Sequence, residues 1–502
     1  MKHKITILAA LFVLATGSAG AQSFGYNETN NLFYFAQRTP QSNMLNPAFF
    51  PSTFYLQLPG LNGLQFGLPL SIGDVVKYDS AQQANIINLN NILDCLTENN
   101  KFRVGFDVNV LGLGVKIAGI FVDANMQLKG NVNLGLPMDA INFVMNGNVQ
   151  PDGTPYPEMP ILDGDFFNMQ MYVETSIGAG MKIPATGLTV GVHAKLLSGL
   201  INLQTDNTKV TFETDPNYES VRARMYYEVM GASIIPIEEG QTVNEMVQNL
   251  GANVKDIALS LIDFNGGNNG VAFDLGAKYK LGPLTLSASI NDLSAGIHWQ
   301  KNVIRMTPKG GQVPIEFNGI DIANLLDRGS INTDTLEQYL NGQLDMMSPQ
   351  FLTDSGDYWY PIPTKLNLAA TVNLGILKAG ILMHGQWDRG LLSKNTYNSV
   401  SELYNDATAG HERLKNTFRF NTTLSVGVNL FNWVEVVAGS SFIYDGSSAI
   451  TINNFLNPGL GLIVTPATLV QAYVMMDYAS SLYFTQMKAF NFKMGFNLLI
   501  GK

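Results

Sequence analysis

Long segments in which every second residue is apolar recur along the whole chain. Residues Val122–Leu136, "VDANMQLKGNVNLGL", alternate without a break, and Phe418–Leu430 and Phe490–Ile500 repeat the pattern. A period of two places the apolar side chains on one face of a β-strand, and it excludes an α-helix, whose repeat is about 3.6 residues. The alternation therefore predicts an all-β fold.

Two further properties of these segments distinguish a membrane barrel from a soluble sheet, which also has one apolar and one polar face. The segments are longer than the usual strand of about 5–6 residues, and they suffice for a tilted bilayer crossing of about 9–11 residues. Their polar faces carry mostly Gly, Ser, Thr and Asn, which suits a crowded or watery lumen. A slip of one residue would turn Lys129 and Asp123 outward, and a Lys at the bilayer midplane costs about 2–4 kcal/mol.

The connections between the segments supply the third property, because they alternate in length. Residues 69–100 and 137–168 form long connections, whereas 118–120 and 184–186 form short turns. Long loops at one rim and short turns at the other are typical of outer-membrane barrels. We therefore expect a closed antiparallel transmembrane β-barrel of about 14 strands, with a break near Asn291-Asp292 in the seventh. The expected crossings are residues 54–68, 102–117, 121–136, 169–183, 187–199, 271–281, 284–306, 364–375, 377–388, 416–430, 433–444, 458–465, 468–478 and 489–500.

The first residues of the chain predict export. Lys2 and Lys4 precede an apolar run, Ile5–Ala15, and small residues end at Ala21. These are the parts of a secretory signal peptide, and the run is shorter than the roughly 20 residues of a spanning helix. We expect residues 1–21 to be removed after Ala21 and the mature protein to reside in the bacterial outer membrane.

Composition excludes several other classes of protein. Without residues 1–21 the chain has 28 Lys and Arg against 40 Asp and Glu, a formal charge of −12, and it has no basic cluster that would favour nucleic acid. Its one cysteine, Cys95, cannot form an internal disulfide or a thiolate metal cluster. Charged residues are only 14% of the chain, against about 25% in ordinary soluble domains. The protein is therefore expected to be kept dispersed by something other than a charged surface.

The sequence contains none of the motifs that are typical of common enzyme classes. There is no GxSxG, zinc-binding His pair, CxxC or phosphate-binding loop, and His193 and His384 fall on or near strands, where we expect hydrogen-bonded lumen residues. We expect no enzymatic activity, no catalytic residue, no cofactor and no metal. Carboxylates on the polar strand faces are expected to shape the electric field of the lumen; they are Asp107, Asp123, Asp274 and Asp477.

Two segments resemble a known family. Asn43–Phe49, "NMLNPAF", and the hairpin Gly270–Leu293, "GVAFDLGAKYKLGPLTLSASINDL", are similar to parts of FadL-type outer-membrane barrels. That group includes long-chain fatty-acid transporters and type IX secretion accessory barrels, and the chain most resembles an uncharacterised Bacteroidota barrel family within it. The resemblance implies a plug or hatch at residues 22–53, with Asn46, Pro47 and Ala48 as its motif, followed by a barrel over residues 54–502.

The N-terminal segment itself agrees with a docked position. "NNLFYFAQR" contains Phe33, Tyr34 and Phe35 in a row, which is too apolar for a free tail. It could fill the lumen, as the resemblance implies, or it could dock on the periplasmic rim.

The resemblance also implies that the third and fourth outer loops, residues 200–270 and 307–363, are long and contain helices. A helical apolar stripe lies in the first of them, and Asp334 with Glu337 can form a capping box in the second. These helices could simply pack over the barrel mouth. Alternatively, four residues of the stripe could form an apolar groove for a hydrophobic solute; they are Val247, Leu250, Val254 and Ile257.

Together the pattern and the resemblance predict a FadL-like channel or transporter that contacts outer-membrane lipid and admits a small hydrophobic ligand. The alternative is a barrel without transport activity, which serves as a structural or accessory part of a surface secretion or attachment complex and binds protein partners at its outer loops.

Overall fold

The computed structural model describes residues 31–236, 267–308, 349–387, 418–444 and 457–501, apart from short gaps, and a few residues between 315 and 342. Three expectations lie outside the described residues. They are the signal peptide (1–21), the capped helix (335–346) and the groove residues Val247, Leu250, Val254 and Ile257.

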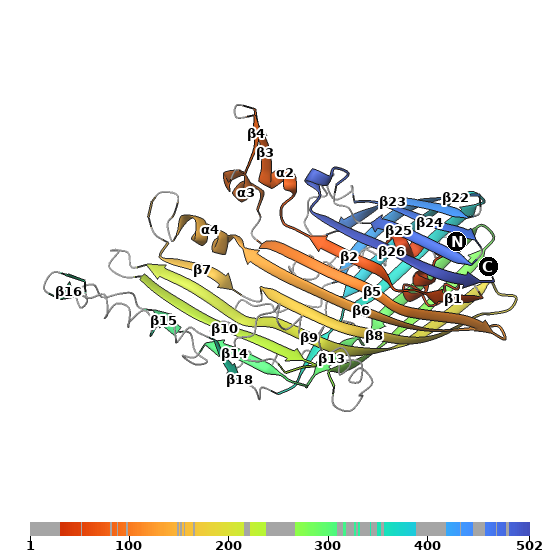
Figure 1. Cartoon of the computed structure of the whole chain (residues 1–502), viewed down its shortest axis with the longest axis horizontal. Coiled ribbons are helices and arrows are strands. Elements are labelled where there is room, and N and C mark those ends of the chain that lie inside the picture. The colour runs from red at the N-terminus through yellow and green to blue at the C-terminus, as the bar shows by residue number, and fades with distance from the viewer. Residues whose placement is uncertain are drawn as a thin grey trace, which may run out of the picture.

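The predicted closed antiparallel barrel of 14 strands is confirmed (Figure 1). The ring closes where the first strand, which is interrupted, pairs with the last, as in Phe54 opposite Ile500 and Phe66 opposite Phe490. Because both ends of the sheet are paired, no edge remains in the wall. In ring order the strands are β1 (Phe54–Gln57) with β2 (Gly60–Gly67), β5 (Asn99–Ile117), β6 (Ile120–Pro137), β8 (Phe167–Lys182), β9 (Leu188–Thr214), β11 (Asn269–Leu281), β12 (Leu284–Leu293), β20 (Thr364–Leu374), β21 (Leu377–Trp387), β22 (Phe418–Leu430), β23 (Val434–Tyr444), β24 (Pro458–Ala467), β25 (Val470–Asp477) and β26 (Ala489–Ile500).

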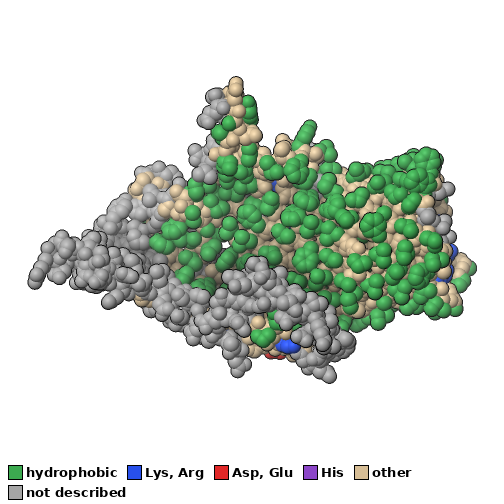
Figure 2. Space-filling view, in the orientation of Figure 1, with side chains coloured by type: hydrophobic (Ala, Val, Ile, Leu, Met, Phe, Trp, Pro, Cys, Tyr) green, Lys and Arg blue, Asp and Glu red, His purple; other side chains and the backbone are tan. Residues whose placement is uncertain are grey.

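The barrel is apolar outside and polar inside. On β26 the side chains of Met494, Phe496 and Leu498 are exposed, whereas Lys493 and Asn497 are completely buried. Figure 2 shows that hydrophobic side chains predominate on the visible face of the barrel, where few charged side chains are in view. An outer face of this kind matches the hydrocarbon core of a bilayer, while polar residues line the lumen.

The fifth strand is longer than the predicted crossing at 187–199. β9 continues to Thr214 and pairs there with β10 (Val221–Ser233), so the expected third loop begins as a two-stranded extension beyond the barrel (Figure 1). Periodicity missed this part because side chains on both faces are covered: Leu200, Ile201, Asn202 and Leu203 are all buried. Additional short strands pair with the extension: β7 (Glu158–Asp163) with β9, and β14 (Ile304–Pro308) and β15 (Ile315–Phe317) with β10.

The seventh strand is shorter than the predicted crossing at 284–306. β12 ends at Leu293, and the chain turns at Asp292 and Ser294, which have positive φ angles of 58° and 57°. The Asp292 carboxylate accepts a hydrogen bond from Lys195 inside the barrel, and this contact fixes the turn at the break that was predicted near Asn291-Asp292. Beyond it, β13 (Gly296–Trp299) pairs with β19 (Tyr358–Pro361), and β14 pairs with β18 (Pro349–Leu352).

Helices are few in the described part of the chain. They are α2 (Ile72–Val75), α3 (Leu89–Cys95) and α4 (Met138–Asn146), with short 3₁₀ turns at η1 (Leu32–Phe35), η2 (Pro40–Met44) and η7 (Phe484–Gln486). None of these described helices is long and apolar enough to cross a bilayer.

Candidate functional site

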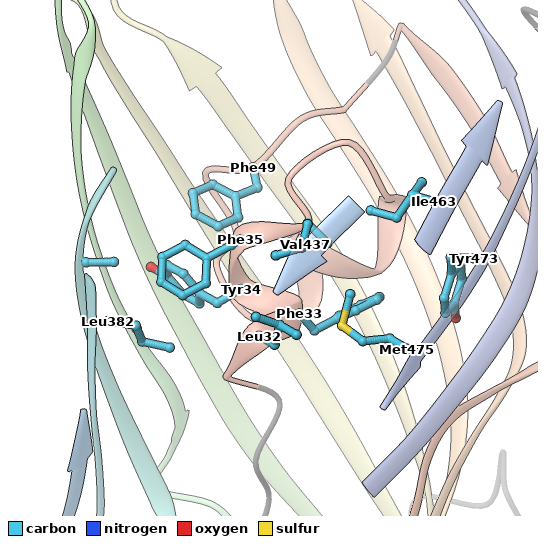
Figure 3. Close-up of a cluster of buried hydrophobic side chains, with 12 residues drawn as sticks. Leu32, Phe33, Tyr34, Phe35, Phe49, Leu382, Val437, Ile463, Tyr473 and Met475 are labelled. Atoms are coloured by element: carbon cyan, nitrogen blue, oxygen red, sulfur yellow. The ribbon is translucent and has the colours of Figure 1, made fainter. Parts of the chain in front are cut away.

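The N-terminal segment, residues 31–49, lies inside the barrel rather than on its rim. Its aromatic run is buried: Phe33 is 3% exposed, Tyr34 1% and Phe35 6%. Figure 3 shows these side chains reaching from the compact segment toward the surrounding wall strands. The cluster that they form with the wall comprises Leu32, Phe33, Tyr34, Phe35, Ala36 and Phe49 from the segment, and Ala369, Leu382, Val437, Ile463, Tyr473 and Met475 from the wall.

Local hydrogen bonds explain why this segment is compact. The Thr39 hydroxyl donates to the Ala36 carbonyl at 2.7 Å, and the Ser42 hydroxyl donates to the Thr39 carbonyl at 2.8 Å. Pro40 begins η2, where its fixed φ angle favours the turn and its missing N–H is not needed. Because short polar side chains satisfy the backbone, the segment can fold without a strand or a long helix.

The predicted motif Asn46-Pro47-Ala48 lies between this segment and the wall. The Asn46 amide nitrogen donates to the Tyr34 hydroxyl at 2.9 Å and to the carbonyl of Ala288 on β12 at 3.1 Å. Burial raises the pKa of Tyr34, so the phenol stays protonated. Its hydroxyl donates a hydrogen bond to the Ser287 hydroxyl at 3.2 Å. The Asn46 side chain also accepts from the backbone N–H of Ala48 at 2.9 Å, which closes a tight turn. The motif thus joins two parts of the segment to the wall.

Glycines in the wall make room for this contact. A Cβ atom at Gly191 would overlap the Pro47 carbonyl oxygen, and one at Gly276 would overlap the Asn46 side-chain oxygen. A Cβ at Gly380 would likewise overlap the Phe35 ring. The backbone of the segment therefore rests directly on the backbone of β9 and β11, and we call Gly191, Gly276 and Gly380 the glycine seats.

A network of opposite charges lies beneath the segment and is almost completely enclosed. Lys195 on β9 is 2.7 Å from Asp292, 3.0 Å from Asp274 and 3.3 Å from Glu174. Lys129 is 2.7 Å from Glu174, and Lys365 is 3.2 Å from Asp292. The buried ion network therefore has three ammonium and three carboxylate groups and no formal excess of charge; its members are Lys129, Lys195, Lys365, Glu174, Asp274 and Asp292.

His193 links this network to the N-terminal segment. Its Nδ1 is 3.2 Å from Asp274, and its Nε2 is 3.1 Å from the side-chain oxygen of Asn43 and 3.4 Å from Asp123. The Nδ1 atom of His384, on β21, lies 2.7 Å from the side-chain oxygen of Asn367. These contacts connect neighbouring wall residues and the segment to one another. Over the part of the chain that the structure describes, no three His, Cys, Asp or Glu side chains come together as metal ligands.

The opposite side of the segment is fastened to the strands near the closure. Gln41 and Asn497 exchange side-chain hydrogen bonds of 2.8 and 3.0 Å, and Gln471 donates to the Arg38 carbonyl at 3.0 Å. Asn31 donates to Asn421 at 2.8 Å. The segment is thus held from β11 and β12 on one side and from β22, β25 and β26 on the other.

Two cavities border the segment, one toward each end of the β20–β21 hairpin. The first has about 700 Å³ of open space and contains Asn367 and His384, near the strand ends that lead to long loops. The second has about 570 Å³ and contains Asn373 and Lys378, beside the short turn. Phe33 and Tyr34 line the first cavity, and Phe35 and Gln37 line the second. The segment therefore separates two spaces in one lumen.

Comparison with known proteins places these features in a family. The model of a family described as "Family of unknown function (DUF5723)" matches residues 47–477, and no curated protein matches the chain.

Solved structures similar to this chain include the Ralstonia pickettii toluene transporter TbuX, which is 9% identical with a TM-score of 0.42. The match covers 92% of this chain and 94% of TbuX. A Pseudomonas aeruginosa FadL homologue is 10% identical, with a TM-score of 0.41 and the same coverage. The P. putida toluene transporter TodX is 11% identical, with a TM-score of 0.37 and 92% coverage of both chains.

Proposed function

The chain belongs to the DUF5723 family of unknown function, and from that premise we propose that it is an outer-membrane channel closed by its N-terminal segment. In this proposal residues 22–53 are a plug, and the barrel begins at residue 54. A small molecule enters from the long-loop rim and passes when the plug moves. The short turns face the periplasm, as in other outer-membrane barrels, and the signal peptide is cleaved after Ala21.

The observation that carries the proposal is the division of the lumen by residues 31–49. The segment contributes residues to both cavities and is seated on wall glycines, so it lies between two spaces of the same lumen. Its hydrogen bonds to the wall are many but individually weak, since each contributes about 0.5–1.5 kcal/mol. Such a segment can shift while the barrel, which closes through its own backbone hydrogen bonds, remains intact.

The lining of the first cavity indicates the class of ligand. Phe33, Met44 and Leu45 give it an apolar side, and amide side chains such as Asn62 and Gln127 give it neutral hydrogen-bonding groups. Apart from Asp107, the charged groups that reach it belong to the buried ion network, whose ammonium and carboxylate groups already neutralise each other. An ionic ligand would have to displace one of these partners, and a buried charge without its partner is unfavourable. We therefore propose a small hydrophobic or neutral amphipathic ligand, and we propose no catalysis, cofactor, metal or nucleic acid.

The loop groove that the sequence predicts at Val247, Leu250, Val254 and Ile257 would be the entry site of this route. It remains a proposal, as does the plug role of Asn46, Pro47 and Ala48. The outer-membrane lipid around the barrel is the partner that the exposed apolar wall requires.

The test is the permeability of proteoliposomes to neutral solutes. The mature chain and a variant lacking residues 23–50 are reconstituted at equal density, and heat-modifiable gel mobility verifies that each barrel is folded. We expect the deletion to increase the uptake of small neutral solutes because it joins the two cavities. Equal permeability of both proteins to every solute tried would contradict the proposal.

The second candidate function is a barrel without transport activity that serves a surface secretion or attachment complex. The observation that favours it is the strand extension of β9 and β10, which projects beyond the barrel and can receive a protein partner (Figure 1). Unchanged permeability after the deletion, together with a stoichiometric partner that is lost when the extension is shortened, would favour this candidate over the channel.

A further inference from the structure

The apolar outer face of the barrel does not end where the strands end. On β26 the exposed side chains lead to Phe490, which stacks on Phe66 of β2 with ring centroids 5.0 Å apart. Directly beyond, the loop before β26 exposes Leu482 (73%), Tyr483 and Phe484 (70%). The lipid-facing surface therefore continues onto a loop at the long-loop rim.

This loop is joined to the first long loop by specific contacts. The Leu68 backbone N–H donates to the Lys488 carbonyl at 2.7 Å, and the Lys488 ammonium is 3.3 Å from the Asp74 carboxylate. Ser71 and Asp74 form a capping box that begins α2, and Gly73 lies against the backbone of Thr485. The two loops thus form one unit above β2 and β26.

A small hairpin extends this unit sideways. β3 (Val76–Asp79) pairs with β4 (Ala84–Ile87), and Figure 1 shows the pair standing out from the barrel wall. The register places Val76 opposite Ile87 and Tyr78 opposite Asn85, so these four side chains share one face. On that face Tyr78 is 66% exposed and Ile87 67% exposed.

Such a hairpin needs a covering surface. Two short strands are marginally stable in water without a hydrophobic face that packs on something else. The main contacts of β3 and β4 are with each other and between β3 and α2, so the Tyr78 face has no large protein contact among the described residues. Tyr78 on the hairpin and Tyr483 on the loop are of the kind favoured at a bilayer interface, where an aromatic ring meets hydrocarbon on one side and water on the other.

We propose that the Tyr78 face of this hairpin and the loop at Leu482–Phe484 form a lipid shelf, which rests in the outer leaflet of the membrane. Lipid acyl chains are the proposed occupant of this face, because the exposed loop at Leu482–Phe484 leads directly into the lipid-facing strand β26 and joins the hairpin through α2. The barrel would then have an asymmetric footprint in the bilayer, wider on the side where its ring closes. This inference depends on the membrane location of the barrel and not on the transport of any solute.

The test measures which solvent contacts each part of the shelf. Single spin labels are attached after Tyr78→Cys, Phe484→Cys, Ala84→Cys or Phe496→Cys, each in a Cys95→Ser background and in phospholipid vesicles. Collisions with molecular oxygen report lipid, and collisions with a water-soluble nickel chelate report water. Phe496 is the lipid control because it lies on the wall, and Ala84 is the matched control because it lies on the opposite face of the same hairpin.

We expect the labels at 78 and 484 to resemble the label at 496, with high oxygen and low nickel accessibility, and the label at 84 to show the reverse. High nickel accessibility at 78 and 484 would overturn the shelf while the label at 496 still verified the barrel in lipid. Shielding of 78 from both reagents would also overturn it, since a second copy or another protein would then cover the face.

Discussion

The two faces of the same barrel wall are specified in different ways. The lipid-facing side needs only residues of one kind, because acyl chains are fluid and fill any apolar outline. The lumen side depends on individual contacts: the glycine seats accept Asn46, Pro47 and Phe35, and Lys195 meets three carboxylates. Conservative substitutions should therefore change stability little on the lipid-facing side and more on the lumen side.

The largest effect is expected in the buried ion network. Lys195→Met removes the ammonium that lies between Glu174, Asp274 and Asp292, and it leaves three buried carboxylates with two ammonium groups in the network. The expected loss is about 3–5 kcal/mol in the free energy of unfolding, measured by urea titration in vesicles. Lys116→Met at the exposed rim is the control and should change it by about 0.5 kcal/mol or less. If both substitutions lowered the free energy of unfolding equally, the buried lumen charges would matter no more than charges at the exposed rim.

The second prediction concerns the lipid face. Phe496→Lys places a charge on the exposed side of β26, and it should lower the free energy of unfolding by about 2–4 kcal/mol if the residue lies near the bilayer midplane. Phe496→Leu keeps the surface apolar and should have a small effect in the same urea titration. A Lys tolerated as well as a Leu would show that this face contacts water.

The third prediction concerns the glycine seats. Gly276→Ala adds a methyl group where the Asn46 side-chain oxygen lies, and overpacking of this kind costs about 1–3 kcal/mol. Because the plug can move more easily than the wall, we expect a higher permeability to neutral solutes with little change in barrel stability. Gly427→Ala is the matched control, since its Cβ would meet only ordinary contacts, the nearest at 3.5 Å. If both variants were as impermeable as the parent, the seat would not position the plug.

The smallest effect is expected at the motif itself. Asn46→Ala removes the hydrogen bonds to Tyr34 and to the carbonyl of Ala288, each contributing about 0.5–1.5 kcal/mol. The plug should become more sensitive to added protease, while the unfolding midpoint of the barrel stays the same. Unchanged protease resistance would mean that the aromatic cluster alone holds the segment.

Most of the barrel could be predicted from the sequence because its outer face follows a period of two. Strands such as β6 and β26 were placed to within a residue, since lipid selects the same residue class at every exposed position. The prediction was wrong about the length of β9, where protein covers both faces and the alternation disappears. It correctly placed a break near Asn291-Asp292 but was wrong to continue the seventh crossing to residue 306, because a carboxylate anchored in the lumen turns the chain there.

Much less of the candidate site could be predicted. The alternation of polar residues correctly assigned Lys129 and Asp123 to the lumen. It could not predict which acidic side chain each basic side chain would pair with. That pairing depends on the register of neighbouring strands and on side-chain reach. The glycine seats had a visible signal, inward-facing glycines in otherwise regular strands, yet only the position of the N-terminal segment shows which of them it occupies.

If residues 31–49 fill the lumen of the folded barrel, their backbone amides should be protected from hydrogen exchange. The N–H groups of Ala36, Thr39 and Phe49 donate to backbone carbonyls within the buried segment. In vesicles they should exchange many times more slowly than in an open chain, and loss of protection should follow Asn46→Ala. Exchange at open-chain rates while the strand amides of β11 stay protected would show that the lumen is not plugged.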